Sequence, residues 1–376
     1  MNTFIKFFFI IFIACIPFKL YSSIPFQYYD GKMIIEVSIN NNPHNFIFDT
    51  GSLTLISNNL KGNLGEKDIN MDFEGIDANG VVSKRKLYST NKINIGDILL
   101  KDLSFSFYET QWISKRACMT IDGVIGANAL DGKIWKIDFK EKKIVFLERE
   151  KKIKKEIRTQ LIEIPFKKDG FTKVPSLNGS IRGIDTDFTF DTGSGMGITI
   201  ENNIYQKIKD EKYLVSEGLL SQGINSVSKG IRVIDLMKFT INNNDLGEQI
   251  VDSSTDATNL IGTRFMENFI TTIDFINNKI LLEPIKNDIR YESFGFMVAP
   301  STGKIKIINV WETEETSLIN LGDEITQIND LVTTELTTDI FCSILEIFRN
   351  KNQITIVKTN GEKLVMKKID LVKKLN

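Results

Sequence analysis

The chain has 376 residues and a formal net charge of −1, because 47 basic residues nearly balance 48 acidic ones. This length predicts two or three domains, and the balanced charge gives no general attraction for nucleic acid or anionic lipid. The single histidine, His44, excludes zinc or di-iron sites that need several histidines, and we expect it to be structural. Three cysteines, Cys15, Cys118 and Cys342, are too few for a disulfide scaffold and form no recognisable metal site, so we expect them to be packing residues.

Residues 1–23 are typical of a secretory signal peptide. One cation, Lys6, precedes an unbroken apolar run over residues 7–18, and two serines follow. The run is shorter than the ~20 residues that a membrane-spanning helix needs, so we expect an exported, periplasmic or secreted protein without a transmembrane segment in the mature chain. A retained anchor, or lipidation of Cys15 in a weak lipoprotein-like box, is the less favoured alternative.

The chain contains an internal repeat, which constrains the architecture before any single motif does. Residues 46–52, with the sequence FIFDTGS, recur as FTFDTGS at 188–194, an offset of 142 positions. Downstream, the hydrophobic-hydrophobic-Gly element at 124–126 is repeated at 260–262, an offset of 136 positions. The repeat predicts that the two halves have the same fold.

Both copies are predicted to be mainly β, because short runs rich in Ile, Val, Phe and Thr are bounded by Asn, Asp and Gly. The expected strands include 33–39, 45–48, 92–95 and 103–107 in the first copy and 186–190 and 237–241 in the second. A helix is expected at 204–212. Asn79-Gly80 and Gln222-Gly223 predict two hairpin tips.

The Asp-Thr-Gly-Ser element behind an apolar triplet resembles the active-site turn of aspartic proteases, and two copies in one chain resemble the bilobal, pepsin-like arrangement of two retropepsin-like lobes. The similarity covers residues 30–285 and includes the element at 124–126 and 260–262, which packs beside the catalytic turn in this family. It implies a mainly β fold with one β-barrel lobe at 24–150 and a second at 151–287.

The paired motifs predict a specific chemistry. If the two copies face each other, Asp49 and Asp191 lie within hydrogen-bonding distance and share one proton, because two negative charges cannot both persist in a partly desolvated site. The ionised member would act as general base on a water molecule while the protonated member donates to the substrate carbonyl, without metal or organic cofactor. Gly51 and Gly193 are expected because glycine accepts backbone angles that other residues avoid. A turn-capping role for each aspartate is the alternative, which the matched pair disfavours.

The resemblance also implies roles for the other turn residues. Thr50 and Thr192 would lock the two turns together through reciprocal hydroxyl bonds, and Ser52 and Ser194 would bond the outer carboxylate oxygens. The first hairpin tip is the candidate flap over the substrate. Tyr88 lies eight residues after that tip, which departs from the pepsin pattern of a flap tyrosine.

The repeat ends before residue 288, and the sequence from 288 onward has a different pattern. An amphipathic helix is predicted over 338–350, and the turn Phe294-Gly295-Phe296 lies near the start of this region. The region 288–376 resembles a PDZ domain of the circularly permuted bacterial type. The resemblance implies that a protein C-terminus binds as an added strand between sheet edge and helix, with its carboxylate held by the backbone amides of that turn. A closed groove, with this domain only packing on the lobes, is the alternative.

These patterns favour an exported, single-chain, monomeric aspartic endopeptidase that hydrolyses polypeptide, with a PDZ domain that recruits or positions polypeptide. A catalytically silent peptide-binding protein is the second hypothesis, and catalysis by lobes that pair between chains is the third. The lysine-rich stretch at 140–158 is expected to be solvated strand and linker rather than a polyanion site, because glutamates interleave with its lysines.

Overall fold

The computed structural model describes residues 23–77, 79–147, 161–223, 226–285 and 289–375. The protein is mainly β, with 53% of the described residues in strands and 14% in helices, as the sequence predicts. Residues 1–22 of the signal peptide expected over 1–23, with Cys15, lie outside the described residues, as do residues 148–158 of the lysine-rich stretch. No helix in the described ranges is both long and apolar enough to cross a membrane.

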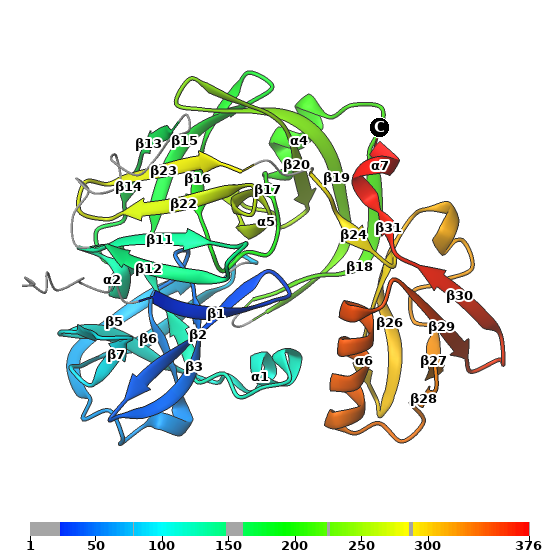
Figure 1. Cartoon of the computed structure of the whole chain (residues 1–376), viewed down its shortest axis with the longest axis horizontal. Helices are drawn as coiled ribbons and strands as arrows, with labels where there is room; N and C mark the ends of the chain where they lie inside the picture. The colour runs from blue at the N-terminus through cyan, green and yellow to red at the C-terminus, as the bar shows by residue number, and fades with distance from the viewer. Residues whose placement is uncertain (1–22, 78, 148–160, 224–225, 286–288, 376) are drawn as a thin grey trace, which may run out of the picture.

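Three parts follow one another along the chain, and Figure 1 colours them from blue to red. The N-terminal part, residues 23–147, contains β1 (Ser23–Tyr29), β2 (Lys32–Ile39), β3 (Asn42–Phe48), β4 (Leu55–Ser57), β5 (Lys67–Ile76), β6 (Val82–Thr90), β7 (Ile93–Ile95), β8 (Ile98–Leu100), β9 (Leu103–Tyr108), α1 (Gln111–Ala117), β10 (Gly123–Ile125), α2 (Ala127–Leu130), β11 (Ile134–Asp138) and β12 (Lys143–Leu147).

The middle part, residues 161–285, contains β13 (Ile162–Pro165), β14 (Lys167–Lys168), β15 (Pro175–Ile181), β16 (Ile184–Phe190), β17 (Ile198–Thr199), α4 (Asn202–Ile208), β18 (Leu214–Gln222), β19 (Val227–Ile241), β20 (Asn244–Ser254), β21 (Leu260–Ile261), α5 (Thr263–Met266), β22 (Phe269–Asp274) and β23 (Lys279–Pro284). The C-terminal part, residues 289–375, contains β24 (Glu292–Ser293), β25 (Phe296–Ser301), β26 (Lys304–Trp311), β27 (Glu324–Ile328), β28 (Leu331–Val332), α6 (Thr338–Asn350), β29 (Gln353–Lys358), β30 (Lys363–Lys367), β31 (Ile369–Asp370) and α7 (Leu371–Leu375).

One sheet joins the N-terminal and middle parts. Its strands run in the order β13-β23-β22-β11-β12-β1-β2-β3-β10-β4-β9-β6-β5, and the two halves meet where β11 pairs antiparallel with β22, Trp135 opposite Ile273 (Figure 1). A single hydrophobic core spans both parts, with Phe46, Phe48, Phe188 and Phe190 from the two repeats fully buried. Burying an aromatic side chain stabilises a fold by roughly 1.5–3 kcal/mol, so these repeated phenylalanines hold the two turns on a common base.

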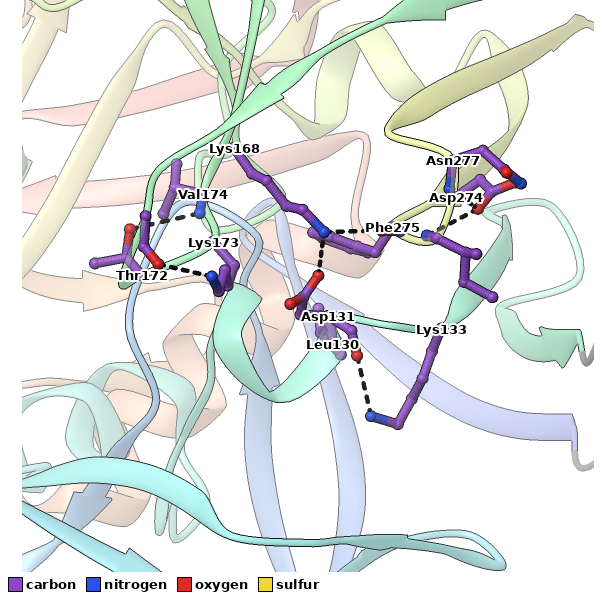
Figure 2. Close-up of polar contacts among 12 residues, drawn as sticks. Leu130, Asp131, Lys133, Lys168, Thr172, Lys173, Val174, Asp274, Phe275 and Asn277 are labelled. Carbon is purple, nitrogen blue, oxygen red and sulfur yellow. Dashed lines mark hydrogen bonds and ion pairs between the residues drawn. The ribbon is translucent and has the colours of Figure 1, made fainter.

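Polar contacts reinforce the seam between these two parts. The ammonium of Lys168, on β14, lies 2.5 Å from a carboxylate oxygen of Asp131 and donates to the carbonyl of Phe275 at 2.9 Å (Figure 2). One side chain of the middle part therefore bridges the end of α2 to the turn after β22.

The C-terminal part has a core of its own but shares a sheet with the middle part. Its core includes Phe294, Phe296, Ile305 and Ile344. Strand β18 pairs antiparallel with β26, with Ser216 opposite Trp311, so the second large sheet continues from the middle part into the C-terminal part.

The helix expected over 338–350 is confirmed with the same bounds as α6, and the side chain of Thr337 caps it by accepting from the amide of Ile340. The bounds expected for the helix at 204–212 are wrong, because α4 spans Asn202–Ile208. The helix ends because the backbone becomes extended at Lys209 (φ −59°, ψ 145°), and the guanidinium of Arg182 donates to the carbonyl of Ile208 at 2.9 Å.

The cysteines correct a second expectation. Cys118 and Cys342 form a disulfide across 224 positions of sequence, so they are not simple packing residues. The folded chain brings the residue after α1 next to the middle of α6, and a spacing of this size carries no sequence signal for such a contact. The disulfide links the N-terminal part covalently to the C-terminal part.

Candidate active site

Each Asp-Thr-Gly-Ser turn begins where a buried strand ends. In the first copy β3 pairs parallel with β10, with Phe48 opposite Ile125, and the amide of Asp49 donates to the carbonyl of Ile125 at 3.0 Å. In the second copy β16 pairs parallel with β21, and the amide of Asp191 donates to the carbonyl of Ile261 at 2.9 Å. The repeated hydrophobic-hydrophobic-Gly elements therefore lie beside the turns, where the family resemblance places them.

Two buried threonines join the turns by four hydrogen bonds. The Thr50 amide donates to the Thr192 hydroxyl at 2.9 Å, and the Thr192 amide donates to the Thr50 hydroxyl at 3.0 Å. Each hydroxyl also donates across the interface, Thr50 to the carbonyl of Phe190 at 2.6 Å and Thr192 to that of Phe48 at 2.9 Å. These are reciprocal bonds of the kind that the resemblance implies, and they fix the separation of the two strand ends.

The carboxyl groups of Asp49 and Asp191 lie beside the turns that these threonine hydrogen bonds join. Each lies against the glycine of the opposite turn: a Cβ on Gly51 would stand 2.4 Å from Cγ of Asp191, and one on Gly193 would stand 2.3 Å from Cγ of Asp49. Neither glycine has a positive φ, so the expected reason for them, backbone angles closed to other residues, is wrong. They are needed because a side chain would occupy the space of the facing carboxyl group.

Burial and the neighbouring acid shift the ionisation of the pair. Burial raises the pKa of Asp49 well above its ordinary value, and the charge of Asp191 and a hydrogen bond with its carboxyl group raise it further. The Gly51 amide, 2.8 Å from the Asp49 carboxyl oxygen, and the ammonium of Lys32 oppose this shift of the Asp49 pKa. The arrangement favours one proton shared between two acids.

The serines of the two motifs do not make the bonds that the resemblance implies. The Ser52 hydroxyl donates to the carbonyl of Leu53 at 2.9 Å, and the Ser194 hydroxyl accepts from the amide of Met196 at 3.4 Å. Both hydroxyls are turned toward their own backbone, so they shape the loop after the turn rather than hold a carboxylate.

The two expected hairpin tips are confirmed, between β5 and β6 and between β18 and β19, and they bind each other. The side-chain amide of Asn79 donates to the Ser226 hydroxyl at 2.8 Å, and that hydroxyl donates to the Asp77 carboxylate at 2.7 Å. Ser221 also donates to the Asn79 side-chain oxygen. We call these four residues the tip contact. Tyr88, by contrast, packs on the rings of Phe105 and Phe107 in β9.

Sequence reasoning missed Lys32. This residue begins β2, and its ammonium donates to the carbonyl of Gly193 in the opposite turn. Nothing in the local sequence distinguishes it from other strand lysines, because its role depends on a contact across 161 positions.

The turn Phe294-Gly295-Phe296 lies at the start of β25. Both phenylalanines are buried and pack edge-on against Phe348 of α6, and the Gly295 amide donates to the Ser293 hydroxyl at 3.0 Å. Gly295 has φ +80°, and a Cβ there would also strike the side chain of Thr316 at 2.4 Å.

One face of α6 packs on the N-terminal part. It carries Cys342, Leu345 and Arg349, spaced three and four residues apart. Cys342 is in the disulfide, Leu345 packs on the cluster around Tyr29 and Ile121, and Arg349 lies 3.8 Å from the centre of the Tyr29 ring. In Figure 1 this helix lies on the side of the C-terminal part that faces α1.

His44 lies away from the paired turns, at the far end of β3, where its Nδ1 is 2.9 Å from the Asp122 carboxylate. Within the described ranges, no cluster of three or more His, Cys, Asp or Glu side chains is arranged to hold a metal ion.

Comparison with known proteins supports an aspartyl protease. Residues 35–129, which include the first Asp-Thr-Gly-Ser turn and its neighbouring element, match a family model described as aspartyl protease. A search of curated proteins found no match to the chain.

Proposed function

We propose that the protein is an exported aspartic endopeptidase in which Asp49 and Asp191 of one chain form the catalytic pair. The observation that carries this proposal is the facing of the two turns: each carboxyl group lies over the glycine of the other, and the threonine bonds hold the turns at that separation. The family match over the first turn supports peptide hydrolysis as the reaction class.

The mechanism follows from the shared proton. The ionised carboxyl group takes a proton from a water molecule between the two acids as that water attacks the amide carbon. The protonated carboxyl group donates to the carbonyl oxygen, so the charge that develops on the oxygen is neutralised without a covalent intermediate. If the first hairpin covers the substrate as a flap, the tip contact would have to open for a polypeptide to enter.

Export of the protein is supported by its disulfide, because such bonds persist in oxidising compartments and are rare in reducing ones. The C-terminal part is proposed to be a PDZ-like domain. Its anchored α6 and its strand pairing with β18 favour positioning of the protease hairpin over capture of a free protein C-terminus.

The test is cleavage of a mixed peptide library by residues 24–376 from acid to neutral pH, with Asp49→Asn and Asp191→Asn variants alongside. We expect turnover that each substitution lowers at least about 10³-fold, since acid–base catalysis contributes roughly 10²–10⁴-fold and both partners are needed. Full activity in either folded variant would remove that residue from the reaction. Peptide binding without turnover at any pH would favour the second candidate, a catalytically silent binding protein.

A further inference from the structure

We propose that Lys32 is a positioning residue of the aspartate pair, whose ammonium sets the pH range in which the pair holds a single proton. The inference deepens the proposed function and rests on it. It begins from a contact between the two repeats: the hairpin between β1 and β2 projects from the N-terminal part onto the catalytic turn of the middle part.

The tip of this hairpin is fixed tightly against that turn. A Cβ on Gly31 would stand 2.2 Å from the Cα of Gly195, so the two backbones touch where only glycine fits. The Gly31 carbonyl also accepts from the hydroxyl of Thr263 at 2.8 Å. Lys32 follows at once, and its half-buried side chain reaches the carbonyl of Gly193.

The bonded carbonyl belongs to the residue that faces Asp49. The space above the Gly193 Cα is filled by the Asp49 carboxyl group, whose Oδ2 lies 2.3 Å from where a Cβ would stand. An ammonium held on this glycine is therefore a fixed positive charge beside the pair. It favours the ionised form of Asp49 and opposes the raised pKa that burial and Asp191 impose.

The other charged groups around the hairpin are engaged elsewhere. On the hairpin itself, Asp30 pairs with Arg116 at 2.9 Å. From α6, Arg349 lies over the Tyr29 ring, and Glu267, the residue after α5, accepts from the Tyr28 hydroxyl. Arg264, on α5, lies 3.8 Å from the centre of the Tyr291 ring. Among the described residues, Lys32 is the cation that bonds to one of the two Asp-Thr-Gly-Ser turns, and its charge lowers the pKa of Asp49.

The consequence has a definite sign. A positive charge lowers both apparent pKa values of a shared-proton pair. It therefore shifts the pH range in which the pair holds one proton to lower pH. Removing the charge should move the whole bell-shaped profile of kcat/KM upward by about one pH unit, the smaller end of what a nearby opposite charge produces. A purely structural role would lower activity at every pH without moving the profile.

Four variants separate these outcomes. Lys32→Met removes charge and donor, Lys32→Gln removes charge but keeps a donor for Gly193, and Lys32→Arg keeps both. Arg116→Gln is the matched control, because it removes a cation from the same hairpin contact without touching the turn. We expect the profile to rise for Lys32→Met and Lys32→Gln and to stay in place for Lys32→Arg and Arg116→Gln.

A second readout does not depend on turnover. Titration of the two aspartate carboxyl carbons by ¹³C NMR should show both apparent pKa values rising in Lys32→Gln relative to the unsubstituted protein. If no variant turns over but this titration moves, the proposed function fails and the inference about Lys32 stands. If folded Lys32→Gln gives the original titration, or turns over with an unmoved profile, the inference is overturned.

Discussion

Gly51 and Gly193 are needed because a larger side chain would not fit there, and not because of their backbone angles. Gly51 and Gly193 have ordinary φ values, yet each lies directly under the carboxyl group of the opposite turn. The motif therefore carries two kinds of requirement at the residue scale. The aspartate supplies the acid, and the glycine two positions later leaves room for the acid of the other repeat.

Replacing Gly51 by alanine should push the Asp191 carboxyl group away, since the new Cβ would stand 2.4 Å from its Cγ. A displacement of about 1 Å can lower turnover about 10²-fold, so we expect a loss of at least that size in kcat with the protein still folded. Peptide cleavage and circular dichroism check this. Gly170→Ala is the control, because a Cβ there meets nothing within 4 Å; equal activity of both variants would contradict the packing argument.

The raised pKa of Asp49 also predicts how stability depends on pH. A carboxyl group whose pKa is raised by folding costs stability as the pH rises from its ordinary value, about 4, through the folded-state pKa. Asp49→Asn removes this cost, so the variant should gain stability relative to the original protein at pH 7 but not at pH 3.5. Urea unfolding at the two pH values measures the difference, with exposed Asp97→Asn as control. A gain of equal size at both pH values would exclude this ionisation as its cause.

Elements of the two repeats act as pairs. The strands β3 and β16 each end directly before one of the aspartates, and the β5–β6 and β18–β19 hairpins meet at the tip contact. The second hairpin is also held at its base, because β18 pairs with β26 of the C-terminal part over Ser216–Gly218. One hairpin therefore connects the C-terminal part to the tip contact.

Asn79→Ala should loosen the tip contact by removing the bond to Ser226 and the one from Ser221. Each hydrogen bond contributes about 1 kcal/mol net, so the loss of two should accelerate amide exchange near the β5–β6 tip about 30-fold. Hydrogen-exchange mass spectrometry checks this. A double-mutant cycle with Ser226→Ala should give a coupling of about 1 kcal/mol, and additive effects of the two substitutions would show that the tips do not act together.

Over the whole molecule, the three parts are connected in more than one way. The N-terminal and middle parts share a sheet and a core, and the middle and C-terminal parts share the β18–β26 pairing. The Cys118–Cys342 disulfide joins the C-terminal part to the N-terminal part, so each part is connected to both of the others. The placement of α6 is therefore fixed from two sides.

Replacing both Cys118 and Cys342 by serine should lower the free energy of unfolding by about 2–5 kcal/mol, because the cross-link restricts a long loop in the unfolded chain. We expect calorimetry to show the C-terminal part melting earlier, while peptide cleavage at low temperature persists. Reductant should produce the same change in the original protein and none in the variant. An unchanged melting curve in reductant would show that the strand pairing alone holds the C-terminal part.

Local pattern by itself determined much of this protein. The repeat predicted Asp49 and Asp191 as the candidate acids, the Asn-Gly and Gln-Gly pairs located the hairpin tips, and the apolar spacing predicted the bounds of α6. These features depend on residues close together in the chain, or on two copies of one motif, so they can be predicted from the sequence.

Contacts between distant segments were decided only by the tertiary structure. Lys32 on Gly193, the disulfide, the tip contact and the space above Gly51 each join residues more than 100 positions apart. The Ser52 and Ser194 hydroxyls instead make local bonds, to the carbonyl of Leu53 and from the amide of Met196, which the resemblance did not predict. Sequence specified the acids, whereas packing decided what surrounds them, since charge and steric contact act through space rather than along the chain.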